Sequence, residues 1–250
     1  MIGHINIHGL RMSNVTMTET LSLIRTMLKE DGFHAIYTPN AEIVMQAVRN
    51  PELADLLNKA DLLLPDGAGV VLGSRILGNP LREKVSGIDV ARGLMRCPES
   101  APIRCFLFGG MPGVAEKAAA HLLTEYPGVR IAGWRNGFFK PEDNEAIVDG
   151  INRAKPDVLF VCLGAPRQEK WMEDNRGRLQ CRVAIGLGGS LDVFAGTVKL
   201  APDWMRRMGL EWLFRLAREP RRWRRMIDLP RFILLTARVR LFGKALRGRS

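Results

Sequence analysis

The residue with the clearest potential for chemistry is Asp66, which follows an apolar run at residues 62–64 and Pro65 and stands immediately before Gly67. An apolar run that stops at a proline, a carboxylate and a glycine predicts a buried strand ending in a loop, and α/β proteins place reactive groups at such strand ends. Asp66 is therefore a candidate catalytic carboxylate. Aspartate before glycine is also common in ordinary turns, because aspartate hydrogen-bonds its own backbone and glycine tolerates positive φ. This stretch alone leaves both interpretations open.

A second polar strand end precedes Asp66 in the chain. Residues 35–37 predict a strand that stops at a proline, and residues 41–48 carry apolar side chains at helical spacing. Asn40 is then the expected N-cap of that helix, a position that favours asparagine. Thr38 and Asn40 nevertheless end a strand just as Asp66 does, and both turns can open on the same edge of a parallel sheet.

A glycine-rich turn follows the next expected strand. Gly109 and Gly110 stand between that strand, at residues 104–108, and an expected helix at residues 114–125. This order can bring backbone N–H groups and a helix N-terminus to a phosphate. It lacks the G-x-G-x-x-G fingerprint, so NAD is not indicated. Tight packing of the strand on the helix explains these glycines equally well.

An expected strand that ends in a polar turn recurs three times further along the chain, and a helix is expected after the first two of these turns. The turns hold Asn136 and Gly137 after strand 129–133, Gly164 after strand 157–163, and Gly189 and Asp192 after strand 183–187. Pro166 suits a first helical turn, in which Gln168 and Glu169 are expected to be exposed. We treat the polar residues of all these turns as candidate substrate-binding residues.

The succession of elements predicts the fold class. Strands that alternate with helices at this spacing imply an α/β fold with a Rossmann-like open, mostly parallel sheet and helices on both faces. A polar loop at residues 79–89 interrupts the series, and its Arg82 and Lys84 belong either to a site or to a solvated surface. Beyond residue 203 the sequence changes character. We therefore expect a core of residues 1–200 and a helical appendage of residues 201–250, with helices over 204–217 and 221–246.

The composition is that of a globular protein, with 250 residues of which 46% are hydrophobic. Its four cysteines lie far apart without a C-x-x-C pair, which favours buried free thiols in a reducing compartment over disulfides or a zinc site. The isolated histidines are expected to be structural. No apolar segment follows Met1 that resembles a signal peptide, so a cytoplasmic location is expected. The longest uncharged apolar stretch of the tail, residues 232–237, is far shorter than the roughly 20 residues that span a bilayer.

The positive charge is concentrated in the tail. Residues 201–250 hold 14 lysines and arginines but only 4 acidic residues, and so carry +10 of the net charge of +11. Such asymmetry predicts an anionic partner. Arg215, Arg218, Arg222 and Arg225 are spaced to share one helical face unless Pro220 breaks the helix. Aromatic residues interleave with these arginines, which suits an anionic membrane surface and also nucleic acid.

Taken together, the motifs resemble those of the WecG/TagA/CpsF family of glycosyltransferases. They are Thr38-Pro-Asn40-Ala-Glu, Leu64-Pro-Asp66-Gly67, Phe108-Gly-Gly-x-Pro-Gly113, Gly164-x-Pro-x-Gln168-Glu-Lys, Gly188-Gly-x-x-Asp192, and Ala201-Pro-x-Trp204 with Gly209-Leu-Glu-Trp212 through Glu219-Pro220. They occur in the family's order from about residue 35 to residue 228. An ordered set is far more specific than any one of its members.

The resemblance implies transfer of a hexose-type sugar from a UDP-sugar to a polyprenyl-diphosphate-linked acceptor, in the synthesis of a cell-surface polysaccharide or a teichoic-acid linker. It implies Asp66 as general base, with Thr38, Asn40 and Gln168 in the substrate pocket. Arginines of the appendage, matching Arg215, Arg222 and Arg225, would reach the diphosphate while the appendage docks on the inner face of the membrane. The family is thought to invert the anomeric centre without a metal or cofactor, and its donors include N-acetylmannosamine, its uronic acid and glucose.

One position departs from the family. Where members commonly carry Glu-Arg-Val, this chain has Glu83-Lys84-Val85. Lysine lacks the planar fork of arginine, so a bidentate contact carried over to Lys84 is weakened or absent.

Elementary chemistry agrees with this assignment. Inverting transfer needs a base for the acceptor hydroxyl and a stabiliser of the charge that builds on the departing UDP. The sequence contains no D-x-D pair to hold a metal there, so bidentate arginine contacts are expected to supply the positive charge. The alternative is a nucleic-acid-binding protein, but that function would not explain the polar residues in the loops of the core. A nucleotide-sugar epimerase or dehydrogenase would need a dinucleotide fingerprint that the chain lacks.

Overall fold

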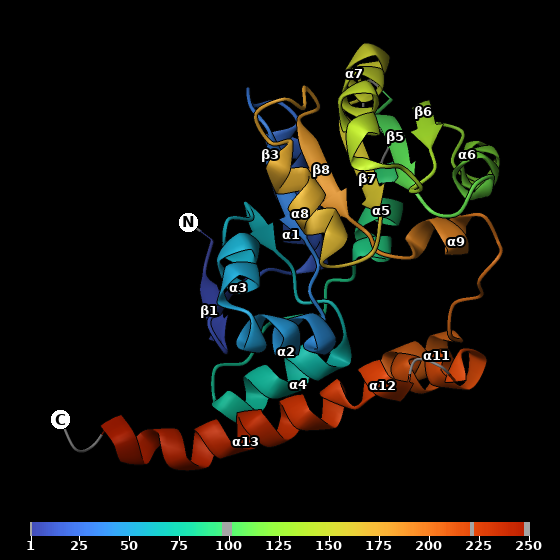
Figure 1. The fold of residues 1–250 in the computed structure, drawn as a ribbon. Coiled ribbons are helices and arrows are strands. Elements are labelled where there is room, and N and C mark those ends of the chain that lie inside the picture. The colour runs from blue at the N-terminus through green and yellow to red at the C-terminus, as the bar shows by residue number, and fades with distance from the viewer. Residues whose placement is uncertain (1, 97–101, 221–222, 248–250) are drawn as a thin grey trace.

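The computed structural model describes residues 2–96, 102–220 and 223–247 (Figure 1). Its centre is a six-stranded sheet in the order β4-β3-β8-β7-β5-β6, with every pairing parallel. The strands are β3 (His34–Tyr37), β4 (Leu62–Leu63), β5 (Arg104–Gly109), β6 (Arg130–Arg135), β7 (Val158–Cys162) and β8 (Val183–Gly186). The predicted Rossmann-like α/β fold is confirmed.

The strand that is last in the sequence lies near the middle of the sheet. In β8, Val183 is in register with His34 of β3 on one side and with Val158 of β7 on the other. This strand joins the β3–β4 half of the sheet to the half formed by β7, β5 and β6. Because all six strands are parallel, their carboxyl ends meet at one edge, where the predicted loop residues follow them.

Two layers of helices cover the sheet, and its strands are apolar on both faces. In β7, Val158 and Phe160 belong to one core cluster and Leu159 and Val161 to the other, as the alternation of side chains along a strand requires. The first cluster includes α1 (Met17–Met27), α5 (Gly87–Arg96), α6 (Val114–Glu125) and α9 (Ser190–Phe194). The second includes α2 (Ala41–Arg49), α3 (Pro51–Asn58), α4 (Ala68–Leu77), α7 (Asn144–Ala154) and α8 (Arg167–Asp174). The short helix η1 (Pro141–Asp143) precedes α7 and has no buried residue. The three described cysteines are free and buried, as expected.

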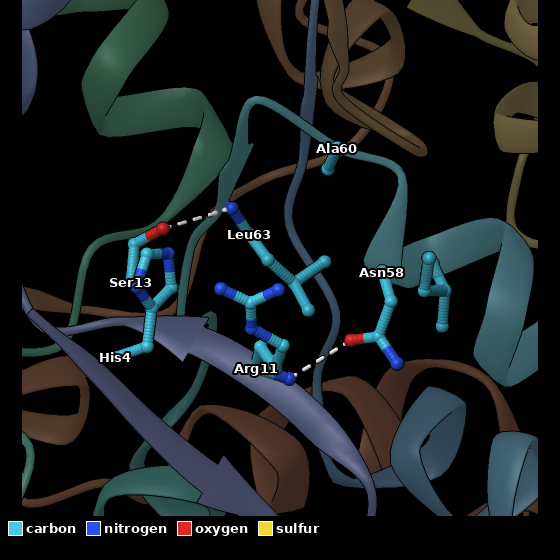
Figure 2. Close-up of a pocket in the computed structure, with 7 residues that line it drawn as sticks. His4, Arg11, Ser13, Asn58, Ala60 and Leu63 are labelled. Carbon is cyan, nitrogen blue, oxygen red and sulfur yellow. Dashed lines mark hydrogen bonds between the residues drawn. The ribbon is translucent and has the colours of Figure 1, made fainter. Parts of the chain in front are cut away.

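A two-stranded antiparallel hairpin, β1 (His4–Ile7) and β2 (Leu10–Ser13), covers the short edge strand β4. The Ser13 hydroxyl accepts a hydrogen bond from the backbone N–H of Leu63 at 3.1 Å, and the Asn58 side chain accepts one from Arg11 N–H at 2.9 Å (Figure 2). The small polar pocket between these elements contains none of the predicted site residues. The hairpin thus protects an edge that would otherwise expose backbone groups.

Helices α1 and α2 begin at side-chain caps, and the predicted Asn40 cap is confirmed. Thr16 caps α1 in a capping box with Glu19, and the Asn40 side chain caps α2 by accepting from Ile43 N–H at 3.1 Å. Helix α5 was not predicted. It starts at Gly87, inside the loop expected at residues 79–89, because its polar and glycine-containing first turn concealed the apolar spacing of its buried face.

Within the described residues 203–220 and 223–247, the tail forms four helices where two were predicted. They are α10 (Asp203–Arg207), α11 (Glu211–Arg218), α12 (Trp223–Met226) and α13 (Asp228–Arg247). Helix α11 ends at Arg218, before Pro220, so Arg215 and Arg218 do not continue in one helix to Arg225 of α12, the condition on which a shared arginine face depended. Arg222 lies outside the described residues, and only the helical backbone of Arg225 is described. Among the helices that the structure describes, none is long and apolar enough to cross a membrane.

Helix α13 runs along α4 and α2 (Figure 1). Phe232 is fully buried, and a Cβ on Gly73 of α4 would lie only 2.5 Å from its ring. The hydroxyl of Thr236 lies 2.8 Å from His8 Nε2, and the Arg49 guanidinium donates to both carboxylate oxygens of Asp228 at 2.9 and 2.7 Å. The division at residue 200 stays a prediction, since α13 packs closely on the core.

Phe232→Ala should therefore lower the free energy of unfolding by about 3–5 kcal/mol, as expected for loss of a buried phenylalanine. Phe242, on the same helix but 63% exposed, provides the matched control. Chemical denaturation should show a change of no more than about 0.5 kcal/mol for Phe242→Ala. If the two substitutions lowered the free energy of unfolding equally, the described packing of α13 on the core through Phe232 would be contradicted.

Candidate active site

A cleft of about 130 Å³ opens between the carboxyl ends of β3 and β4 and the first part of the tail. We call it the Asp66 cleft. Its lining residues come from the core, from the tail segment of α10 to α12 and from the start of α13: Asn40, Ala41, Glu42, Asp66, Gly67, Ala68, Gly69, Lys84, Arg206, Gly209, Glu211, Trp212, Arg215, Met226 and Leu229. Among the described residues, no three His, Cys, Asp or Glu side chains are arranged to hold a metal ion.

The predicted meeting of the first two strand ends is confirmed within this cleft. The backbone N–H of Asp66 donates to the carbonyl of Pro39 at 3.2 Å, which joins the loop after β4 to the loop after β3. Asn40 lines the cleft next to Asp66 and at the same time caps α2. The cap interpretation of Asn40 is confirmed, and its predicted contact with substrate stays a prediction.

The surroundings of Asp66 change its proton affinity. Burial raises the pKa of Asp66 to about 6, with a further upward contribution from the Glu211 carboxylate and opposing contributions from Arg215 and Lys84. Such a group is deprotonated at neutral pH but holds a proton more firmly than an ordinary aspartate. This combination suits a general base.

The same pKa predicts that Asp66 destabilises the fold at neutral pH. Below the ordinary aspartate pKa the carboxyl is protonated in both the folded and unfolded states, whereas above about pH 6 the folded state must hold the charge at a cost. Asp66→Asn should therefore raise the free energy of unfolding by about 2–3 kcal/mol at pH 7.5, at about 1.4 kcal/mol per pKa unit.

Chemical denaturation of both proteins across pH checks this expectation. The difference should be small near pH 4 and should grow as pH rises toward 6. Asp55→Asn, at an exposed position on α3, controls for the loss of one negative charge. A difference between Asp66→Asn and wild type that does not vary with pH would show that Asp66 is not desolvated in the folded protein.

Thr38 lies between the cleft and the rest of the sheet edge. Its hydroxyl donates to the carbonyl of Gly186 at 2.8 Å and so ties the end of β3 to the end of β8. It does not itself line the described cleft. Thr38 thus has a structural role next to Asn40, because it links two strand ends. The predicted contact of Thr38 with substrate stays a prediction.

Four of the predicted residues gather at the ends of β5 and β6, in a group that we call the glycine edge. Gly137 N–H donates to Gly110 O at 2.9 Å, and Gly110 N–H donates to Cys162 O at 3.2 Å. A Cβ on Gly109 would lie 2.2 Å from the same Cys162 oxygen, so this close approach requires glycine. The Asn136 side chain accepts from Phe138 N–H and shapes the turn.

Gln168 and Glu169 are buried, so their predicted exposure was wrong. Each is only 2% exposed, because the first turn of α8 packs against β8 at Gly186, where a Cβ would come within 2.8 Å of Gln168 Nε2. Gln168 donates to Glu169 at 2.8 Å and accepts from Gly188 N–H at 2.9 Å. Burial raises the pKa of Glu169. The pair thus holds the turn after β8.

The remaining predicted residues follow β7 and β8. Gly164 accepts a backbone hydrogen bond from Gln168 N–H, which begins α8. Gly189 precedes α9, and Asp192 stands in the first turn of that helix. Asp192, Gly164 and Gly189 do not line the Asp66 cleft. The predicted residues therefore form two groups on one sheet edge, linked through Thr38 and Gly186.

The tail contributes Arg215 to the cleft, as the resemblance implied. Arg215 donates to Glu211, one helical turn earlier. Lys84 also lines the cleft, whereas Arg82 pairs with Glu19 on the surface at 2.7 Å. The sequence left open whether Arg82 and Lys84 belong to a site or to the surface. In the structure Lys84 lines the cleft and Arg82 lies on the surface.

Sequence reasoning did not assign Arg206, Glu211 or Trp212 to the site, although all three line the cleft. Glu211 and Trp212 belong to the Gly209-Leu-Glu-Trp212 motif, directly before Arg215, and that proximity could have identified them. Nothing in the spacing indicated Arg206, because its position depends on the turn at Gly209.

Comparison with known proteins agrees with the motifs. The sequence model of the Glycosyl transferase WecG/TagA/CpsF family matches residues 5–246. A Bacillus subtilis relative is 37% identical over 91% of this chain and 89% of its own length. A relative from Bacillus spizizenii is 38% identical over 83% of this chain and 80% of its own length, and one from Staphylococcus aureus is 32% identical over 94% and 93%.

All three relatives carry the name N-acetylglucosaminyldiphosphoundecaprenol N-acetyl-beta-D-mannosaminyltransferase. The match covers nearly the whole chain, including the Asp66 cleft, the glycine edge and the tail. The chain is therefore a hexosyltransferase that belongs to the WecG/TagA/CpsF family of glycosyltransferases.

Proposed function

We propose that this enzyme transfers a hexose-type sugar from a UDP-sugar to a polyprenyl-diphosphate-linked saccharide, with inversion of the anomeric centre and without a metal. The observation that carries the proposal is the position of Asp66 in a cleft that also holds Lys84, Arg206 and Arg215. Burial in this cleft raises the pKa of the Asp66 carboxyl to about 6. The names of the relatives favour N-acetylmannosamine as the sugar and N-acetylglucosaminyldiphosphoundecaprenol as the acceptor.

In this reaction Asp66 takes the proton from the acceptor hydroxyl as its oxygen attacks the anomeric carbon. The bond between that carbon and the diphosphate oxygen breaks, and UDP leaves with the electron pair. Negative charge builds on the departing diphosphate. Arg215 supports it through charge-assisted hydrogen bonds, and Arg222 and Arg225 are proposed for the same task.

The glycine edge is the proposed site for the donor. Gly109, Gly110 and Gly137 present backbone close to the N-terminal end of α6, an arrangement that favours phosphate. Asn136, Gly164, Gly189 and Asp192 extend the same edge toward β8. Thr38 and Asn40 are proposed to contact the transferred sugar, and Gln168 with Glu169 supports the turn after β8.

The tail is the proposed membrane contact. Its exposed apolar side chains include Trp204, Trp223, Leu234, Leu241 and Phe242, on helices that also carry arginines. This combination suits peripheral binding to an anionic bilayer, where the lipid-linked acceptor resides. We propose that the enzyme acts at the inner face of the cell membrane and does not use nucleic acid.

Release of UDP from a panel of UDP-sugars tests the proposal. The acceptor is a short-chain polyprenyl diphosphate carrying N-acetylglucosamine, supplied in anionic vesicles. We expect acceptor-dependent release that is fastest with UDP-N-acetylmannosamine. Release that is equally fast without acceptor, or no release with any sugar on the panel, would contradict the proposed transfer.

A further inference from the structure

Helices α10 and α11 contribute Arg206, Glu211, Trp212 and Arg215 to the Asp66 cleft but have little apolar attachment to the core. Every residue of these two helices is at least partly exposed, and Trp204 is largely so, as is Met208 directly after α10. By contrast, α13 is held by the buried Phe232. The position of Arg215 and Glu211 over Asp66 must therefore depend on a few specific contacts.

The strongest of these contacts is an ion pair between α10 and α5. Arg206 Nη2 donates to both carboxylate oxygens of Asp89, at 2.8 and 2.7 Å. The side chains are only 17% and 30% exposed, so solvent screens the pair less than an ordinary surface ion pair. Asp89 lies in the first turn of α5, where a negative charge is favoured, and also accepts the Ser86 hydroxyl.

The second contact is made by backbone. Gly209, with φ of 73°, turns the chain between α10 and α11, and a Cβ placed on it would lie 2.7 Å from the Cβ of Ala68. Ala68 is the first residue of α4, two positions after Asp66. The turn therefore rests directly on the loop that carries the proposed base, at a closeness that only glycine allows.

We propose that Asp89 and Arg206 form a latch that seats the α10–α11 segment on the core and thereby positions Arg215 and Glu211 over Asp66. Both are positioning residues, because they act through the groups that face the reacting atoms. The catalytic consequence rests on the proposed transferase function, whereas the seating of the segment does not.

Breaking the ion pair between Asp89 and Arg206 should change the pKa of Asp66. The charged groups that change the pKa of Asp66 are Glu211 and Arg215 from α11, Lys84 from the loop before α5, and Asp89 from α5. Glu42 and Arg206 are further charged residues in the lining of the cleft. Burial is the largest cause of the raised pKa. When α11 moves away, Asp66 becomes more exposed to solvent, so its pKa should fall toward the ordinary value for aspartate.

The test compares Arg206→Gln, Asp89→Asn and the double variant with Arg207→Gln, which removes the same charge from the next, exposed position of α10. Arg206→Gln should lower kcat about tenfold, equivalent to about 1.4 kcal/mol, with little change in the donor KM. It should also move the acidic midpoint of the kcat–pH profile to lower pH. The double variant should lose little more than either single variant, because the two residues act as a pair.

Limited proteolysis of the full-length protein supplies a readout that does not depend on activity. Arg206→Gln and Gly209→Ala should both speed cleavage near residues 196–203, and Arg207→Gln should not. If Arg206→Gln matches Arg207→Gln in cleavage rate, kcat and pH midpoint, the latch does not exist. If wild type shows no transfer but Arg206→Gln still speeds cleavage, the proposed function fails while the latch stands.

Discussion

Asp66→Asn should lower kcat for sugar transfer by about 10²–10⁴-fold, the usual contribution of a positioned general base. The amide keeps the size of the carboxylate but cannot accept the proton of the acceptor hydroxyl. UDP affinity should change little, because the glycine edge proposed for the donor lies outside the Asp66 cleft. Steady-state UDP release and calorimetric titration with UDP measure the two quantities separately.

The pH profile and a matched control separate this effect from general damage. In wild type, kcat should rise as pH increases through about 6, as Asp66 loses its proton. Asp55→Asn, which removes a carboxylate from the surface, should keep both the rate and the profile. Because Asp66→Asn is also expected to be more stable than wild type at pH 7.5, an inactive variant cannot be explained by unfolding. Near-normal turnover in that variant would remove Asp66 from the base role.

Arg215→Gln should lower kcat by about 10²–10³-fold, the loss expected when one group that stabilises developing negative charge is removed. Arg218→Gln is the matched control, since Arg218 is on the same helix but stacks against Phe214 and does not line the cleft. The control should retain most activity. Arg215→Lys should recover only part of the loss, because lysine cannot form a bidentate contact with phosphate.

The two arginine variants should also differ in pH dependence. Arg215 lowers the pKa of Asp66, and Glu211, which it binds, raises it. Loss of Arg215 leaves Glu211 unopposed, so the acidic midpoint of kcat should move to higher pH in Arg215→Gln and stay in place in Arg218→Gln. A fall in kcat without this movement would place Arg215 away from Asp66 during turnover.

The sheet could be predicted from the sequence because its strands are buried on both faces. Runs such as residues 158–162 are apolar at every position, and each is followed by a glycine turn and a helix. The order of the strands could not be obtained in this way. The central place of β8 is set by packing between its flanking strands, which no local pattern records.

The site was only partly predictable for the same reason. Asp66 and Asn40 end consecutive strands, so their meeting followed from parallel topology alone. The burial of Gln168 and Glu169 depends on the space left by Gly186 on a strand distant in sequence, and a polar first helical turn looks solvent-exposed without that knowledge. Arg206 likewise reaches Asp89 only because Gly209 turns the tail back over the core.

The most direct test of the central claim is the rate of a single turnover, from UDP-N-acetylmannosamine to a lipid-diphosphate N-acetylglucosamine acceptor, in wild type and Asp66→Asn between pH 5 and 8. The proposed mechanism predicts a wild-type rate that rises through a midpoint near pH 6, and a variant rate that is lower by at least about 10²-fold and nearly independent of pH. A variant that keeps both the rate and the midpoint of wild type would contradict the assignment of Asp66 as the base.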